Sequence, residues 1–148
     1  MLEGFPAVAV QPVQWGDQDL FGHVNNTVYF RWYETSRVEY WYKSGLHELM
    51  NPRGLGPILA SVKCDYKKQI RYPDTIKVAA RIEKMGHSSV TLEHVVFSET
   101  QQAIAATGKS IIVLFNYEKQ HPVPIEGCLL YTSPSPRDLS TSRMPSSA

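Results

Sequence analysis

The segment 26–44 constrains the fold most, because it has helical periodicity and contains neither proline nor glycine. Its aromatic and small side chains recur at three- and four-residue spacing, which predicts a helix of about five turns. Asn25 or Asn26 can cap its start, and Gly45 can end it. So aromatic a helix should be buried on more than one side. The positions that define the period are Val28, Tyr29, Trp32, Tyr33, Ser36 and Tyr40.

The hydrophobic pattern changes to a period of two after the segment 51–57, whose glycines and prolines predict a loop. Apolar and other residues alternate over 76–83, which is typical of a strand with one covered and one wetter face. A short strand over 8–14 precedes the helix, with Pro12 at its edge or end. Further strands are expected at 58–66, 90–98 and 104–115. This order predicts an α+β fold in which an antiparallel sheet wraps the helix.

The composition limits the class of protein. The 148 residues fit one domain, and 43% hydrophobic and 20% charged residues are ordinary for a globular protein. A formal net charge of +1 predicts no strong attraction to nucleic acid or to an anionic membrane. The longest apolar run, 111–115, is far shorter than the roughly 20 residues of a membrane span. With two cysteines and no secretory signal, we expect a soluble cytoplasmic protein without a disulfide framework, a metal site or a cofactor.

The segment 126–148 differs in character from the rest of the chain. From Thr132 onward it holds six serines and three prolines and has no hydrophobic periodicity. Such a composition does not form packed structure. We therefore expect residues 1–125 to form the domain. Residues 126–148 are expected to be a disordered tail or, as we favour, a non-native vector or adapter sequence.

An acidic turn precedes the helix. Asp17, Asp19 and Gly22 are spaced like the start of a calcium-binding loop, but the later ligand positions carry phenylalanine and valine, which excludes that site. Both carboxylates can simply favour the helix N-terminus. Alternatively, one of them serves a site built from the glycine turn and the free N–H groups at 24–26. His23, in the same turn, is as compatible with a structural role as with a functional one.

Other motifs for catalysis are absent or incomplete. Gly108-Lys109-Ser110 ends like a phosphate-binding loop, but Ala103 stands where its first glycine belongs. No nucleophile elbow is present. The histidines without an obvious partner, for which packing or exposure is expected, are His47, His87, His94 and His121.

The segment 15–29, WGDQDLFGHVNNTVY, resembles the opening motif of the hotdog-fold acyl-CoA thioesterases of the 4-hydroxybenzoyl-CoA thioesterase type. The resemblance implies a curved antiparallel sheet of about five strands wrapped around one central helix. It also implies a homodimer or homotetramer in which paired subunits complete the active sites. The resemblance spans residues 8–125 and continues through Asp65-Tyr66, Tyr72-Pro73-Asp74-Thr75, Gly86-His87-Ser88-Ser89, Ala106-Thr107-Gly108 and Pro122-Val123-Pro124-Ile125.

The same resemblance implies hydrolysis of an acyl-CoA to free acid and coenzyme A. The catalytic carboxylate of that family is the second acid of its motif, which is Asp19 here. The family's oxyanion donor is a backbone N–H at the start of the central helix, at or next to Asn26. Asp19 can act as base or as nucleophile, and His23 is a weaker catalytic candidate. Candidates for substrate contact are Gly22, Tyr29, Lys67, Arg71, Gly86, Ser88 and Ser89.

Two alternatives to this function remain open. An acyl-carrier-protein thioesterase would need a basic docking surface larger than Lys67, Lys68 and Arg71 supply. A non-catalytic hotdog module would bind acyl-CoA or serve as a dimeric scaffold. The sequence does not specify the acyl group or choose between dimer and tetramer.

Overall fold

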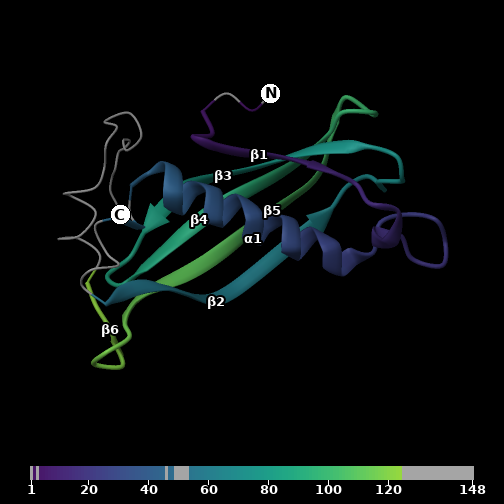
Figure 1. The fold of residues 1–148 in the computed structure, drawn as a ribbon. Coiled ribbons are helices and arrows are strands. Elements are labelled where there is room, and N and C mark those ends of the chain that lie inside the picture. Colours follow the sequence, from purple (N-terminus) through teal and green to yellow (C-terminus); the bar gives the residue numbers. More distant parts are fainter. Residues whose placement is uncertain (1, 3, 46, 49–53, 125–148) are drawn as a thin grey trace.

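The computed structural model describes residues 2, 4–45, 47–48 and 54–124. It has an α+β architecture in which one antiparallel sheet packs against one long helix (Figure 1). The expected tail over 126–148 lies outside the described residues. The elements in chain order are β1 (Ala7–Pro12), the 3-10 helix η1 (Trp15–Asp17), α1 (Asn26–Lys43), β2 (Leu55–Tyr66), β3 (Thr75–Met85), β4 (Ser89–Ser98), β5 (Ala103–Asn116) and β6 (His121–Pro122).

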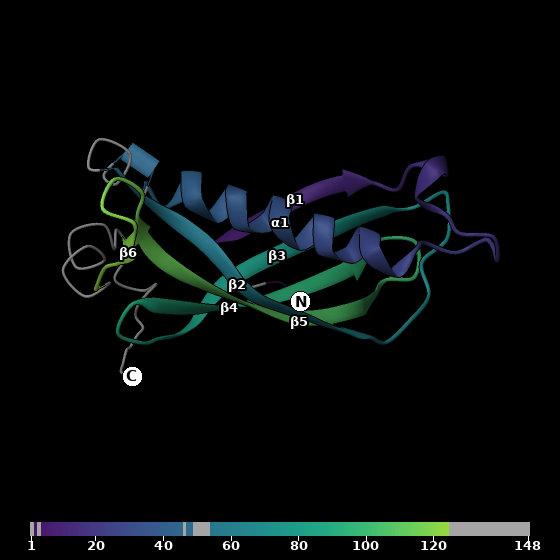
Figure 2. The ribbon, with the colours of Figure 1, turned by 90° about the horizontal axis from the view of Figure 1, so that it is seen from below.

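The sheet has the strand order β1-β3-β4-β5-β2, and the short β6 pairs with the end of β5. Every pairing is antiparallel. The strands β1 and β2 therefore form the two edges. Figure 2 shows α1 lying along one face of the twisted sheet. This arrangement confirms the predicted fold, with the two-residue β6 as the unpredicted addition.

Helix α1 forms where the periodicity predicts it. Asn25 is its N-cap, because its side chain accepts a hydrogen bond from the Thr27 N–H at 3.0 Å. Gly45, with a φ of +80°, follows the last turn and lets the chain leave the helix. Among the described residues a single sheet covers the helix, so the prediction of burial on more than one side is wrong there. The buried residues form one stripe, made of Val28, Tyr29, Trp32, Tyr33 and Ser36.

The loop predicted over 51–57 is wrong at its end, because β2 begins at Leu55. Pro57 is tolerated there since β2 is an edge strand, where one row of backbone groups needs no partner in the sheet. Gly56 packs closely against Tyr117, because a Cβ at this position would lie 2.8 Å from the ring, which would then have to shift. The Tyr117 hydroxyl also donates to the Pro57 carbonyl at 2.9 Å. Residues 49–53 lie outside the described ranges.

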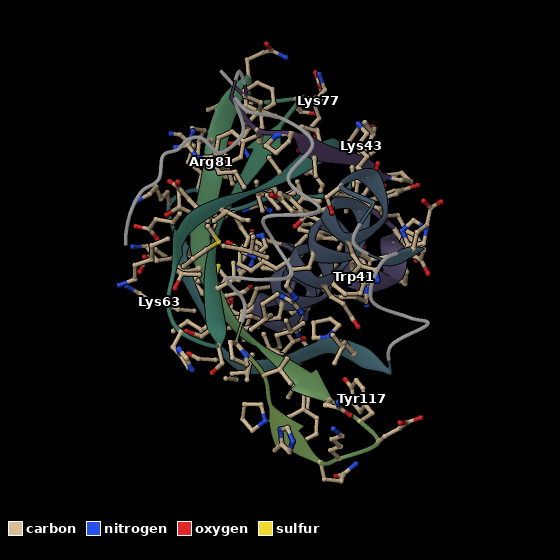
Figure 3. All side chains as sticks on the ribbon, turned by 90° about the vertical axis from the view of Figure 1, so that its left-hand side faces the viewer. Trp41, Lys43, Lys63, Lys77, Arg81 and Tyr117 are labelled. Atoms are coloured by element: carbon tan, nitrogen blue, oxygen red, sulfur yellow. The ribbon has the colours of Figure 1, made fainter. Side chains whose placement is uncertain are left out.

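The face of the sheet away from α1 carries charged side chains. Figure 3 shows Lys63 and Arg81 on this face. Nε of Arg81 on β3 lies 2.9 Å from a carboxylate oxygen of Glu93 on β4. This face is the wetter face of the strand that the alternation over 76–83 predicts. No helix within the described residues is long and apolar enough to cross a membrane.

Candidate active site

The acidic turn is a closed loop immediately before α1. The Asp19 N–H donates to the His23 carbonyl at 2.9 Å, and the Gly22 N–H donates to the Asp19 carbonyl at 3.2 Å. Gln18 and Val24 close the loop as an isolated antiparallel bridge. Gly22 has a φ of +84°, a left-handed conformation that side chains resist. The turn therefore holds Asp19 at a fixed place next to the start of the helix.

The two carboxylate oxygens of Asp19 have different surroundings. Oδ1 accepts the Phe21 N–H at 2.8 Å, which is a local turn contact of the Asx type. Oδ2 lies 3.5 Å from Nδ1 of His23, and the Asp19 side chain is 26% exposed. One oxygen thus holds the turn while the other faces His23, and the side chain as a whole is partly exposed.

The start of α1 leaves one backbone donor open. The N–H groups of Val24 and Asn25 donate to backbone carbonyls at 2.7 and 2.9 Å. The Thr27 N–H is taken by the Asn25 side chain at 3.0 Å. The Asn26 N–H has no acceptor among the described residues. Of the free donors that the sequence predicts at 24–26, only this one remains for an anion or a developing oxyanion.

Asp17 has a different role from Asp19. Its side chain is 6% exposed, accepts the Gln14 N–H at 2.9 Å and pairs with Nη2 of Arg31 at 2.8 Å. Because Arg31 belongs to α1, this ion pair ties the turn to the helix. Asp17 thus has a specific structural contact, and its contribution to the helix N-terminus stays a prediction. Both oxygens of Asp17 are occupied, which leaves Asp19 as the available carboxylate of the turn.

A polar cavity lies beside the acidic turn. It is an open surface hollow of about 520 Å³, and its lining consists of Lys68, Gln69, Arg71, Pro73, Asp74, Thr100 and Gln101. Nη1 of Arg71 lies 3.5 Å from the Gly22 carbonyl, which connects the cavity to the turn. Lys67 is anchored next to it, because its N–H donates to the Ala105 carbonyl at 2.8 Å. The structure therefore places Arg71, one member of the predicted basic cluster, against the acidic turn.

A buried carboxylate, that of Asp74, is one of the residues that line this cavity. Its side chain accepts hydrogen bonds from the Thr75 and Thr100 N–H groups at 2.7 and 3.0 Å and from the Ser98 hydroxyl. These contacts join the segment before β3 to the turn after β4. The Tyr-Pro-Asp-Thr motif thus has a structural role, with Asp74 as its anchor. Among the described residues, no group of three or more His, Cys, Asp or Glu side chains is placed to hold a metal ion.

Tyr29 is a buried residue of the core at this end of the molecule. It is 2% exposed, and its ring packs edge-on against the Tyr66 ring with 4.9 Å between the ring centroids. Burial raises the pKa of Tyr29 to about 12, so its phenol stays neutral. The Tyr66 hydroxyl donates to the Asn26 carbonyl at 3.0 Å. Tyr29 and Tyr66 together support the helix start.

The segment 86–89 is not brought to Asp19 within one chain. It forms the hairpin between β3 and β4, where the Gly86 N–H donates to the Ser89 carbonyl at 2.7 Å. The start of β3 lies at the end of the sheet near the acidic turn, and the strand has 11 residues. At about 3.3 Å per residue, the hairpin lies roughly 30 Å away. Figure 1 shows the two regions at opposite ends.

The sequence missed a buried polar network under α1. The sequence predicts no partner for His94. In the structure, Nδ1 of His94 lies 3.0 Å from the Ser36 hydroxyl, and Nε2 lies 2.6 Å from the Ser110 hydroxyl. Its ring stacks on Tyr33 at 4.6 Å. Burial and the nearby charge of Arg37 lower the pKa of His94 to about 3, so the ring is neutral. Only the pairing of the helix with the sheet brings these residues together.

The antiparallel sheet on one long helix, with the acidic turn at the helix start, defines an α+β protein of the hotdog type. The model of the thioesterase-like superfamily matches residues 13–132. The chain belongs to this superfamily.

Three known proteins illustrate the similarity. A crystal structure of a Thermus thermophilus thioesterase with coenzyme A and zinc is 27% identical, with a TM-score of 0.75 over 88% of this chain and 99% of that one. A protein of Aquifex aeolicus with the provisional name of an esterase is 29% identical over 73% of this chain and 85% of its own length. A DHNA-CoA thioesterase from Staphylococcus aureus, 22% identical, shares the fold with a TM-score of 0.73 over 82% of this chain and 81% of that chain.

Proposed function

We propose that the protein hydrolyses an acyl-CoA thioester to the free acid and coenzyme A. The observation that carries the proposal is the partly exposed Asp19 side chain in a closed turn directly before the open Asn26 N–H. Membership of the thioesterase-like superfamily supports thioester chemistry. The Thermus thermophilus relative, crystallised with coenzyme A, supports the choice of thiol.

In the proposed reaction, the thioester carbonyl oxygen lies over the Asn26 N–H. This donor and the helix dipole stabilise the negative charge that develops on the oxygen, and one such donor is typically worth about 2.7–4 kcal/mol. Asp19 either takes a proton from an attacking water or attacks the carbonyl carbon itself. In both routes the carbon–sulfur bond breaks, the thiolate of coenzyme A leaves, and water supplies the oxygen of the acid. His23, close to the second Asp19 oxygen, positions that carboxylate.

The nucleotide end of the substrate is assigned to the polar cavity beside the turn. Arg71 and Lys68 line it, and guanidinium and ammonium groups are suitable partners for phosphates. Lys67 adds a further positive charge nearby. Arg71 also lies against the Gly22 carbonyl, so a phosphate held there would extend its pantetheine arm toward Asp19.

We further propose that the protein acts as a homodimer or higher homo-oligomer. The β2 strand forms a 12-residue sheet edge that carries the partly exposed Ile58 and Leu59. An unpaired edge of this length is a natural surface for a second copy. Antiparallel pairing of two β2 edges would place the hairpin of one copy at the end where the other copy has Asp19. Gly86, Ser88 and Ser89 would then meet the substrate of the partner.

A thiol-release assay tests the proposed function. The chain is given short, long and aromatic acyl-CoA thioesters and, in parallel, the same acyl groups on an acyl carrier protein. Saturable thiol release that is faster from the coenzyme A esters supports the proposal. A clear preference for the carrier-protein esters would transfer the activity to that substrate class. No release from any ester would identify a non-catalytic module and overturn the proposal.

A further inference from the structure

Tyr66 connects an edge of the sheet to the start of α1. It is the last residue of β2, where it pairs with Ala106 of β5. The next two N–H groups, those of Lys67 and Lys68, both donate to the Ala105 carbonyl, at 2.8 and 3.0 Å. Figure 1 shows the end of β2 and the start of α1 at the same end of the molecule. The backbone around Tyr66 is therefore anchored to the sheet beside the helix start.

The Tyr66 side chain is held by its ring and reaches the helix through its hydroxyl. The ring packs edge-on against the buried Tyr29 ring, with 4.9 Å between the ring centroids. The hydroxyl donates to the Asn26 carbonyl at 3.0 Å. Since 44% of Tyr66 is exposed, it contributes less to the core than Tyr29 does. The contact with the helix backbone is thus its most specific interaction.

The peptide unit that follows Asn26 is held at both ends. Its N–H, that of Thr27, donates to the Asn25 side chain at 3.0 Å. Its carbonyl, that of Asn26, accepts the Tyr66 hydroxyl. A carbonyl at this place in an α-helix also accepts the N–H four residues later, so Tyr66 uses the second lone pair. Because a peptide unit is planar, holding both of its ends fixes the backbone torsion ψ of Asn26.

The preceding peptide unit carries the Asn26 N–H, which has no acceptor among the described residues. Its carbonyl, that of Asn25, accepts the Val28 N–H at 3.0 Å. The strength of a hydrogen bond depends on the direction of its donor. The direction of this N–H depends in turn on the Asn26 backbone, which Tyr66 holds. A hydroxyl has one proton, and since Tyr66 donates it to the carbonyl, it does not donate to a substrate oxygen.

We propose that Tyr66 is a positioning residue for acyl-CoA hydrolysis, in which its hydroxyl holds the Asn26 carbonyl and so directs the Asn26 N–H at the thioester oxygen. This inference rests on the proposed function. Tyr66 acts through the Asn26 backbone and does not contact the reacting atoms. A hydrogen bond to the oxygen strengthens as negative charge develops in the transition state. The loss of alignment should therefore lower kcat more than it changes KM.

The kinetics of Tyr66→Phe test this role, with octanoyl-CoA or benzoyl-CoA as substrate, whichever the chain hydrolyses faster. Phenylalanine keeps the ring against Tyr29 and removes only the hydroxyl. We expect kcat to fall about tenfold and KM to change by less than about twofold. Thr35→Val removes another hydroxyl that donates to an α1 carbonyl, that of Arg31 at 3.1 Å, and should change neither constant. An unchanged kcat in Tyr66→Phe, or an equal fall in both variants, would overturn the inference.

Infrared spectroscopy of the bound thioester gives a readout that a merely structural role would not move. The same thioester, isotopically labelled at its carbonyl, is bound to Asp19→Asn, where a hydrogen bond from the Asn26 N–H lowers the carbonyl stretching frequency. We expect a smaller lowering when Tyr66→Phe is added to Asp19→Asn, and no change when Thr35→Val is added instead. An equal lowering with and without the Tyr66 hydroxyl would contradict the inference.

Failure of the proposed function and failure of this inference are distinguishable. No hydrolysis of either ester by the unmodified chain overturns the proposed function and the role of Tyr66 with it. No lowering of the carbonyl frequency in Asp19→Asn overturns the oxyanion role of the Asn26 N–H, and again the role of Tyr66. Hydrolysis and a lowered frequency that both persist unchanged in Tyr66→Phe overturn the role of Tyr66 alone.

Discussion

Two aspartates that look equivalent in the sequence have separate roles in the structure. Asp17 is buried against Arg31, whereas Asp19 keeps an oxygen beside His23. The sequence motif could identify the pair and, through the family resemblance, favour Asp19. It could not show that Arg31 occupies Asp17, because that contact depends on how the turn folds back onto the first turns of the helix.

Gly108 illustrates a residue whose identity is set by close packing. A Cβ at this position would lie 2.5 Å from the Lys63 carbonyl oxygen and 2.5 Å from a ring carbon of Tyr33. We predict that Gly108→Ala lowers the free energy of unfolding by about 1–3 kcal/mol, because backbone and a buried ring must shift. Chemical denaturation measures the change. Gly16→Ala, where a Cβ would meet nothing within 4 Å, is the control, and equal losses in both variants would contradict this explanation.

At the scale of elements, helix α1 is the part that the sequence predicted best. The predicted and observed ends agree within one residue, because a cap, an uninterrupted aromatic period and a glycine all point to the same limits. The start of β2 was missed because Gly56 and Pro57 read as a loop. A strand accepts these two residues here because β2 is an edge strand and because Tyr117 packs against Gly56. Both features belong to the tertiary structure and cannot be read from the local sequence.

The N-terminus of α1 provides a prediction that separates capping from catalysis. Asn25→Ala removes the acceptor of the Thr27 N–H and should lower the free energy of unfolding by about 1 kcal/mol. Asn26→Ala should keep both stability and acyl-CoA hydrolysis, because the proposed oxyanion donor belongs to the backbone. Thermal unfolding and thiol release measure the two effects. A strong loss of hydrolysis in the folded Asn26→Ala variant would transfer the role to the side chain.

At the scale of the whole molecule, the layer order of helix and sheet was predictable, but the interior polar network was not. The alternation along each strand predicts which face of the sheet is buried, but it does not predict which residues pack against that face. Ser36, His94 and Ser110 come from α1, β4 and β5, and their contact requires the register of both layers. The hairpin at 86–89 is likewise remote from Asp19 within one chain, so its predicted part in the site depends on a second copy.

The neutral His94 predicts how stability depends on pH. Its pKa in the folded protein, about 3, lies below the ordinary value of 6.5, so the unfolded chain takes up the proton first. The contribution to stability is fully present above about pH 6.5 and is lost as the pH falls toward about 3, by up to about 1.4 kcal/mol per pH unit. His94→Gln should therefore show a shallower loss of unfolding free energy between about pH 6 and pH 4. Urea unfolding measures it, and the exposed His87→Gln is the control; identical slopes in both variants would be inconsistent with a buried neutral His94.

The most direct test of the central claim is the kcat/KM of Asp19→Asn for acyl-CoA hydrolysis. Asparagine can still accept the Phe21 N–H, so the turn should persist while the negative charge is lost. We predict a fall of about two or more orders of magnitude with an unchanged melting temperature. Asp17→Asn, the matched control, should lower stability more than activity, because it weakens the pair with Arg31. Near wild-type hydrolysis by folded Asp19→Asn would contradict the assignment of this carboxylate to catalysis.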